Sequence, residues 1–148
     1  MSDTLSKRRL RLWLRLLRVT RSAERDLGEF VRTEHDSTLP RFDVLAALYR
    51  ADEPLTMGEL SRQLLVSNGN TTTVVTRLHA DGLVDRTTAD DDRRVVMVSL
   101  TPAGRAHFEQ LATGHEQAVD HLFADASAAD LDQLDELLHR LTPRKARR

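Results

Sequence analysis

The feature that most constrains the fold is a change of hydrophobic period in the middle of the chain. Residues 56–82 contain two short stretches with apolar side chains at helical spacing, separated by the polar segment 67–70. Residues 83–87 and 94–100 are instead strand-like, with β-branched residues concentrated in the second, and a charged turn joins them. The middle of the chain therefore predicts two short helices around a tight turn, followed by a β-hairpin with a charged tip.

Local signals place the ends of these two helices. Thr56 and Glu59 have the spacing of a capping box, in which each side chain bonds the other residue's backbone N–H. Ser67 is a suitable N-cap for the second helix, and Gly82 is expected to end it in the left-handed conformation. The second helix would bury residues at relative positions 0, 3, 4 and 7, namely Thr71, Val74, Val75 and Leu78.

Longer helices are expected on both sides of this region. Apolar periodicity predicts a helix over 5–34 and a second from Pro40 to about Arg50. After Thr101-Pro102 we expect a helix to about Ala124, and then a last helix over 128–141. The fold class is therefore mainly α with a small β-hairpin wing, a winged helix-turn-helix with flanking N- and C-terminal helices.

The flanking helices predict a dimer. Their apolar stripes are long for a chain of 148 residues to cover by itself. The simplest explanation is that a second copy of the chain covers them. We expect a single subunit over 1–148, with a winged helix-turn-helix lobe at 42–100 and dimerisation helices at 5–34 and 102–141.

The composition of the chain limits where the protein can be located and what kind of partner it can bind. The chain has no cysteine and no apolar run of the roughly 18 residues that a membrane span needs, and arginines interrupt the apolar residues near the N-terminus. We therefore expect a cytoplasmic protein with no membrane partner. The net charge is −1, but residues 1–35 carry nine basic and five acidic side chains, whereas residues 95–141 carry two and eight. Such a polarised chain can present a basic face.

The outer face of the second short helix has side chains that suit the major groove of DNA. Threonine, asparagine and arginine can bond phosphates or base edges there. Within the charged tip, one arginine can pair with Asp92 while the other enters the minor groove. Ordinary solvated surfaces would explain the same residues. The candidate DNA-binding residues are Ser67, Asn68, Asn70, Thr72, Thr73, Thr76, Arg77, Arg93 and Arg94.

The stretch from Leu39 to Gly104 resembles the MarR family of bacterial regulators. The resemblance implies a two-fold dimer with recognition helices in successive major grooves and wings over the minor grooves. It also implies that the candidate residues between Asn68 and Arg77 face DNA, with Arg93 or Arg94 at the wing tip. The ordered motifs that carry it are LPRFDVL at 39–45, MGELS at 57–61, VSNGNTTTVVTRL at 66–78, DGLV at 81–84, DRR at 92–94 and LTPAG at 100–104.

A finer similarity concerns a subgroup that controls aromatic-acid catabolism. It rests on RLWLRLL at 11–17, TLPRFD at 38–43 and VSNGN at 66–70. The resemblance implies a small aromatic acid or its coenzyme A thioester as effector, bound between the dimerisation helices and the DNA-binding lobe. Trp13 would stack on the ring, although plain core or dimer packing is the favoured explanation for it, and Arg15 or Arg41 would hold an anionic group. The candidate ligand-binding residues are Trp13, Leu17, His35, Arg41, Phe42 and Leu45.

The sequence contains no sign of catalysis. We find no phosphate-binding glycine loop and no nucleophile elbow. His107, His115 and His121 share a helix, but none is four residues from another, so we expect no metal and no cofactor. The predicted function is a ligand-relieved repressor that binds a pseudo-palindromic operator as a homodimer. The alternative is a helical dimeric protein-interaction module without DNA binding.

Overall fold

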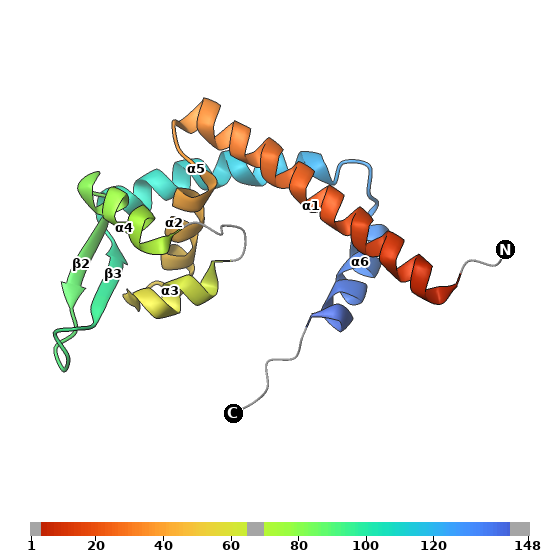
Figure 1. The fold of residues 1–148 in the computed structure, drawn as a ribbon. Coiled ribbons are helices and arrows are strands. Elements are labelled where there is room, and N and C mark those ends of the chain that lie inside the picture. Colours follow the sequence, from red (N-terminus) through yellow and green to blue (C-terminus); the bar gives the residue numbers. More distant parts are fainter. Residues whose placement is uncertain (1–3, 65–69, 143–148) are drawn as a thin grey trace.

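The structure is a computed structural model that describes residues 4–64 and 70–142. It consists of six helices and a small sheet within these residues (Figure 1), and the predicted order of elements is confirmed. The elements are α1 (Leu5–His35), α2 (Leu39–Ala51), β1 (Leu55–Thr56), α3 (Met57–Gln63), α4 (Thr71–Ala80), β2 (Val84–Thr88), β3 (Val96–Leu100), α5 (Pro102–Leu122) and α6 (Ala128–Leu141).

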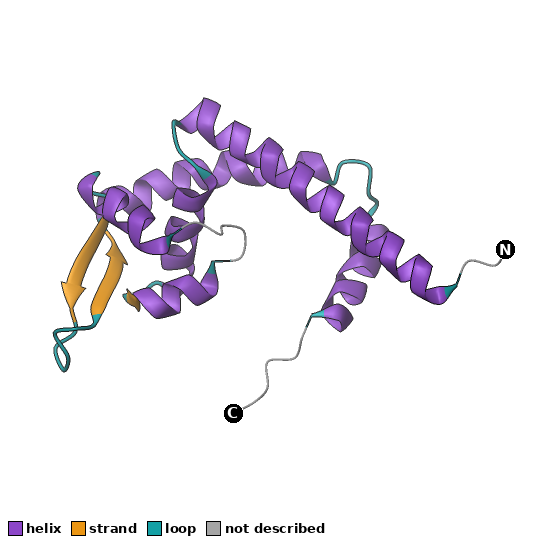
Figure 2. Ribbon diagram, viewed as in Figure 1, coloured by secondary structure: helices purple, strands orange, loops and turns teal. Residues whose placement is uncertain are grey.

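The helices and the sheet separate into a lobe and an extension. Helices α2, α3 and α4 gather with the sheet at one end, while α1 and α5 run together away from this lobe. Helix α6 follows α5 at the end of the extension farthest from the lobe (Figure 2). The mainly helical fold with a small β wing is therefore as the sequence predicts.

The sheet has one strand more than the predicted hairpin. Its order is β1-β3-β2, and both pairings are antiparallel. Strand β1 is only two residues long, and its Thr56 is also the N-cap of α3, so it is too short to show alternation. Strand β3 begins at Val96, which leaves Arg94 in the connection instead of the strand where the sequence placed it.

The core of the lobe forms around α2. Six of the seven positions from Phe42 to Leu48 are buried, all except Asp43, and the helix contacts α4, α5 and the sheet. Helix α4 contributes Val75 and Leu78 to the same core, which fixes the direction of its opposite face.

The extension contributes little to this core. Val31 is the one buried residue described for α1, and α6 has none among its described residues. Large apolar side chains are instead exposed, including Trp13 at 55% and Leu141 at 66%. Even so, none of the described helices combines the length and hydropathy needed to cross a bilayer.

The helix caps confirm two of the predicted signals and correct a third. Thr56 N donates to Glu59 Oε2 at 2.8 Å and Glu59 N donates to Thr56 Oγ1 at 3.1 Å, which is the predicted capping box. Gly82 has the predicted left-handed conformation, with φ of +73°. The N-cap of α4 is Asn70, so the prediction of Ser67 as this cap was wrong; the asparagine carboxamide is the better-placed acceptor for a helix that begins at Thr71.

Candidate nucleic-acid interface

The outer face of α4 carries a group of uncharged polar side chains and one arginine. Val75 and Leu78 are completely buried, so the opposite side of this ten-residue helix faces solvent. The predicted residues on that side are all exposed: Thr72, Thr73, Thr76 and Arg77. Of the other candidates, Ser67 and Asn68 lie outside the described residues.

Asn70 has a structural role at the start of α4. Its Oδ1 accepts from Thr72 N at 3.1 Å and from Thr73 N at 3.4 Å. The carbonyl side of the carboxamide is therefore used by the helix, and its NH₂ group is the part left to contact DNA.

The wing reaches the outer face of α4 through Arg86. Its Nη1 donates to Thr76 Oγ1 at 3.5 Å, while Thr76 Oγ1 itself donates to the carbonyl of Thr72 at 2.8 Å. Arg86 was missed in the sequence, since no spacing relates a residue of β2 to one of α4. It adds a second exposed cation beside Arg77.

The connection between β2 and β3 holds one arginine in place by an ion pair. Asp92 accepts from the backbone N–H of Arg94 at 3.0 Å and from its Nε at 3.2 Å. These hydrogen bonds, the backbone one first, hold the pKa of Asp92 below its usual value. The Arg94 side chain is nevertheless 92% exposed. Arg93 is exposed too, and it has no ion pair within the described part of the chain.

Three contacts join α4 and its C-terminal turn to the rest of the lobe. Arg41 of α2 donates from Nη2 to Asp81 Oδ2 at 2.7 Å. Thr101 Oγ1 donates to the carbonyl of Gly82 at 2.7 Å, and His79 Nδ1 lies 3.0 Å from the carbonyl of Val84. The C-terminal end of α4 is thus held against the lobe, and the Arg41 guanidinium predicted to hold a ligand is already paired with Asp81.

The six predicted ligand-binding residues do not come together in one subunit. Trp13 and His35 both lie on α1 but are separated by 22 residues, which corresponds to about 33 Å along the helix. Leu17 is on the same N-terminal half as Trp13. Leu45 is completely buried in the core and has no surface to offer a ligand. Within one subunit these residues therefore do not line one pocket, and their joint role in a dimer stays a prediction.

Phe42 is the predicted ligand residue that does line a cavity. Its ring stacks on His115 of α5 at a centroid distance of 4.2 Å. The cavity has a volume of about 190 Å³ and lies between α2, α3 and α5; its lining is Phe42, Asp43, Ala46, Arg50, Gln63, Leu64 and His115.

The acidic group of this cavity was missed by sequence reasoning. Asp43 Oδ2 is buried and has no hydrogen-bond partner within the described residues. Burial raises the pKa of Asp43 to about 6, although the positive charge of Arg50 opposes the shift. Burial also lowers the pKa of His115, so this ring favours its neutral form. The available sequence signal was a single carboxylate inside the apolar run 42–48.

The fold, the exposed face of α4 and the arginine-bearing wing define a winged helix-turn-helix protein. A family model described as MarR family matches residues 35–95, from the end of α1 into the wing. A MarR family transcriptional regulator from Silicibacter pomeroyi has 30% sequence identity and a TM-score of 0.80, with 95% of this chain and 97% of that chain covered. The chain therefore belongs to the MarR family, whose members are transcription regulators and not enzymes.

Two further comparisons give the extent of the similarity. An HTH-type transcriptional regulator from Bacillus cereus is 34% identical over 99 residues, which are 67% of this chain and 64% of that protein. The match thus spans just under two thirds of that relative. A mutant MarR from E. coli, crystallised with operator DNA, is 28% identical with a TM-score of 0.80; 95% of this chain and all of that chain are covered.

Proposed function

We propose that this protein is a transcription regulator that binds a pseudo-palindromic operator as a homodimer and is released from it by a small ligand. The observation that carries the proposal is the joint exposure of the α4 polar face and the wing arginines. Arg86 bridges the two by its contact with Thr76, so one continuous surface contains both. The similarity to an operator-bound MarR supports the same use of the surface.

In this proposal α4 enters the major groove. Thr72, Thr73 and Thr76 are small enough for the backbone of α4 to approach the bases, and Arg77 and Arg86 contact phosphates or guanine. Candidates Ser67, Asn68 and Asn70 would act at the amino end of the same helix. The positive end of the helix dipole favours a phosphate there.

We assign different roles to the two wing arginines because Arg94 forms the ion pair with Asp92. This pair uses the Nε edge of Arg94 and leaves the other edge of the guanidinium exposed, so the side chain is already oriented before DNA binds. We therefore assign Arg94 to the minor groove, where the negative potential attracts arginine, and Arg93 to the neighbouring phosphates.

Dimerisation is part of the proposal because one α4 reads only half of a palindrome. The exposed apolar residues of α1 and α6 supply the surface for a second copy. The expected operator has half-sites about one helical turn apart, roughly 10 base pairs. We propose a repressor, with the bound dimer covering the promoter and so blocking transcription.

The proposed effector is a small aromatic acid in the cavity beside Phe42. Its ring would contact the stacked Phe42 and His115, and its carboxylate would pair with Arg50. The volume of about 190 Å³ lies below the roughly 300 Å³ at the lower end of common ligand pockets. A coenzyme A thioester would therefore place only its aryl group inside. The cavity joins α2 and α3 of the lobe to α5 of the extension, so a ligand there can move one against the other.

The test is a titration of labelled DNA from upstream of the protein's own gene. We expect a specific complex whose log affinity falls steeply between about 50 and about 200 mM salt, because phosphate contacts release counterions. The double variant Arg93→Ala with Arg94→Ala should lose at least about tenfold in affinity. The matched control, Arg25→Ala with Arg32→Ala, removes the same charge from α1 and should bind as the unmodified protein does.

Two results would change the proposal. If the unmodified protein forms no specific complex with this or neighbouring intergenic DNA, the protein-interaction module becomes the better explanation. If aromatic acids release the complex but the Arg50→Ala variant is released equally well, the effector binds elsewhere.

A further inference from the structure

The tilt of α4 relative to the lobe depends on a small number of directional contacts. Val75 and Leu78 are completely buried and determine which face of the helix points outward. Apolar packing is not directional, whereas hydrogen bonds are, so polar contacts are better suited to hold the tilt. The cap at Asn70 is formed within α4 itself and does not connect the helix to another element.

Among the described residues, one ion pair joins α4 to α2. Arg41 Nη2 donates to Asp81 Oδ2 at 2.7 Å, and Asp81 is the C-cap of α4. The Arg41 side chain is only 20% exposed, whereas that of Asp81 is 53% exposed. Arg41 Nε is buried and has no hydrogen-bond partner within the described part of the chain. The contact with Asp81 therefore anchors a guanidinium that is mostly withdrawn from water.

Helix α2 is a suitable anchor because it forms the centre of the core. Six of the seven positions that follow Arg41 are buried, and the helix contacts α4, α5 and the sheet. Arg41 itself leaves the first turn of α2. Its ion pair thus connects the C-terminal end of α4 to the middle of the lobe.

The other polar contacts at this end of α4 lead to β2 and to the start of α5. Thr101, the N-cap of α5, donates from Oγ1 to the carbonyl of Gly82 at 2.7 Å. His79 Nδ1 lies 3.0 Å from the carbonyl of Val84, the first residue of β2. These contacts place α4 against the base of the wing, so they do not replace the link to α2.

A small change of tilt at Asp81 becomes a large displacement at the other end of α4. Thr72 precedes Asp81 by nine residues, which corresponds to about 13 Å along the helix. A tilt of about 10° around the C-cap would therefore move Thr72 by about 2 Å. Hydrogen bonds to base edges tolerate less than this, whereas long arginine side chains can follow a phosphate over such a distance.

We propose that Arg41 is a positioning residue for operator recognition: its ion pair with Asp81 holds α4 at the tilt that base readout needs, although neither residue contacts DNA. The inference rests on the proposed entry of α4 into the major groove. Loss of the pair should reduce the preference for the operator over other DNA. The general attraction to phosphates should remain, because it depends on the exposed arginines.

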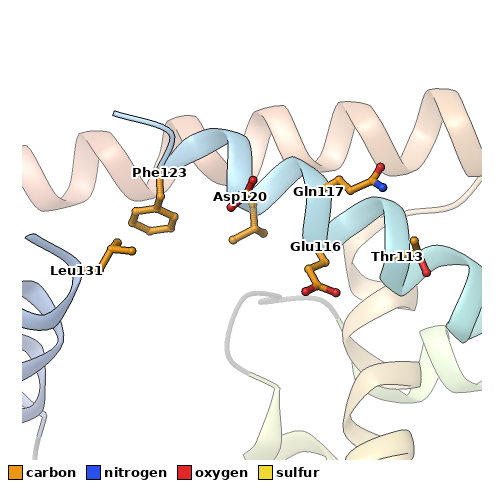
Figure 3. Close-up of a pocket in the computed structure, with 7 residues that line it drawn as sticks. Thr113, Glu116, Gln117, Asp120, Phe123 and Leu131 are labelled. Atoms are coloured by element: carbon orange, nitrogen blue, oxygen red, sulfur yellow. The ribbon is translucent and has the colours of Figure 1, made fainter. Parts of the chain in front are cut away.

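Two cavities that border α5 differ in their relation to this ion pair. The cavity of about 190 Å³ is lined by Phe42, the residue that follows Arg41 in α2. A larger hollow of about 540 Å³ lies between the end of α5 and the start of α6, with Phe123 and Leu131 on opposite sides of it (Figure 3). The described residues around this hollow belong to α5, α6 and the turn between them. Of the two, the first is therefore the cavity whose occupation can shift the ion pair.

The test measures the affinity of full-length protein for the operator and for a scrambled duplex of the same length, by fluorescence anisotropy. The variants are Arg41→Gln and Asp81→Asn. Each should bind the operator at least about fivefold more weakly and the scrambled duplex as tightly as the unmodified protein does. Effector is omitted, so the ligand role predicted for Arg41 cannot contribute.

The aspartate variant is the more informative of the two because a purely electrostatic role predicts the opposite sign. If Asp81 acted only through its charge near DNA, Asp81→Asn would strengthen binding to both duplexes. If Arg41 contacted a phosphate, Arg41→Gln would weaken both duplexes equally and reduce the salt dependence. Either result would overturn the inference.

The double variant Arg41→Gln with Asp81→Asn tests whether the two residues act as a pair. It should bind the operator no more weakly than either single variant, because one substitution already breaks the contact. Losses that add would refute the pair. The conservative variant Arg41→Lys keeps a cation within reach of Asp81 and should recover most of the operator preference.

A second ion pair of α2 supplies the matched control. Arg105 Nη2 of α5 donates to Asp52 Oδ1, at the C-cap of α2, at 2.6 Å. Asp52→Asn with Arg105→Gln should lower the midpoint of thermal unfolding about as little as the other double variant, since partly exposed ion pairs stabilise weakly. The control should nevertheless keep the full operator preference. An equal loss of preference would show a general loosening of the lobe and would refute the positioning role.

The same titrations separate this inference from the proposed function. If the unmodified protein does not prefer the operator to the scrambled duplex, the proposed function fails and the inference fails with it. If that preference is clear and survives in both single variants, only the inference fails.

Discussion

Replacing Gly104 with alanine should destabilise the protein because this glycine lets α5 contact the backbone at the base of the wing. Gly104 is in the first turn of α5 and is buried. A Cβ atom there would overlap the carbonyl oxygen of Leu83 and lie 2.8 Å from its carbonyl carbon. Both are backbone atoms, so no side-chain rotation relieves the overlap. Leu83 is also held by its hydrogen bond from Thr101 N, at 3.2 Å.

The expected cost follows from two opposing effects. Forcing an extra methyl group into a packed backbone contact costs about 1–3 kcal/mol. Replacing glycine by alanine in a helix returns at most about 1 kcal/mol, and less in a first turn. We therefore expect a net loss of about 2 kcal/mol, which lowers the midpoint of thermal unfolding by roughly 4–8 °C for a protein of this size.

The assay compares thermal unfolding of Gly104→Ala and Gly28→Ala at one protein concentration, because dimerisation contributes to stability. Gly28 lies inside α1, and a Cβ there would meet only Leu39 Cδ1 at an ordinary 3.5 Å. The control should therefore gain about 0.5–1 kcal/mol. Equal midpoints for the two variants would show that α5 does not approach the Leu83 backbone so closely.

Three further predictions concern the lobe. Asn70→Ala removes the α4 cap and should cost about 1 kcal/mol in urea unfolding; an unchanged midpoint would mean that Asn70 does not cap α4. The pKa of Asp43 is raised from 3.8 to about 6, so its ionised form disfavours folding above pH 6. Asp43→Asn should therefore add about 1 kcal/mol near pH 8, an amount discounted for partial exposure, and nothing below about pH 4. A pH-independent difference would exclude this cause. Asp92→Asn should weaken DNA binding without changing thermal stability, because it frees Arg94; anisotropy titration measures the affinity, and unchanged binding would remove Asp92 from the wing mechanism.

Local rules predicted most of the fold because the relevant signals lie close together in the sequence. The capping box needs only residues 56–59, and the buried face of α4 needs only its own periodicity. Strand β1 was not predicted because it forms only by pairing with β3, about 40 residues later in the chain. Asn70 and Ser67 are both good caps, and only the start of α4 distinguishes them.

The candidate site was harder to predict because it depends on distance across the fold. Exposure of the α4 face followed from one helix, but Arg86 joins it through a contact between α4 and β2. The predicted ligand residues came from the family resemblance and not from a local pattern. Within one subunit a continuous helix separates Trp13 from His35 by about 33 Å. The ion pair of Arg41 with Asp81, 40 residues later, likewise has no signal in the sequence.

The continuity of α5 limits how this chain can change in length. The helix runs unbroken from the wing base at Pro102 to Leu122, about 30 Å away. One inserted residue within it would turn its far end by about 100° relative to the lobe and advance it by only about 1.5 Å. Insertions of three or four residues nearly restore the original direction. Length variants of α5 that preserve its geometry should therefore differ by whole helical turns, whereas the turn after Leu122 can accept single residues.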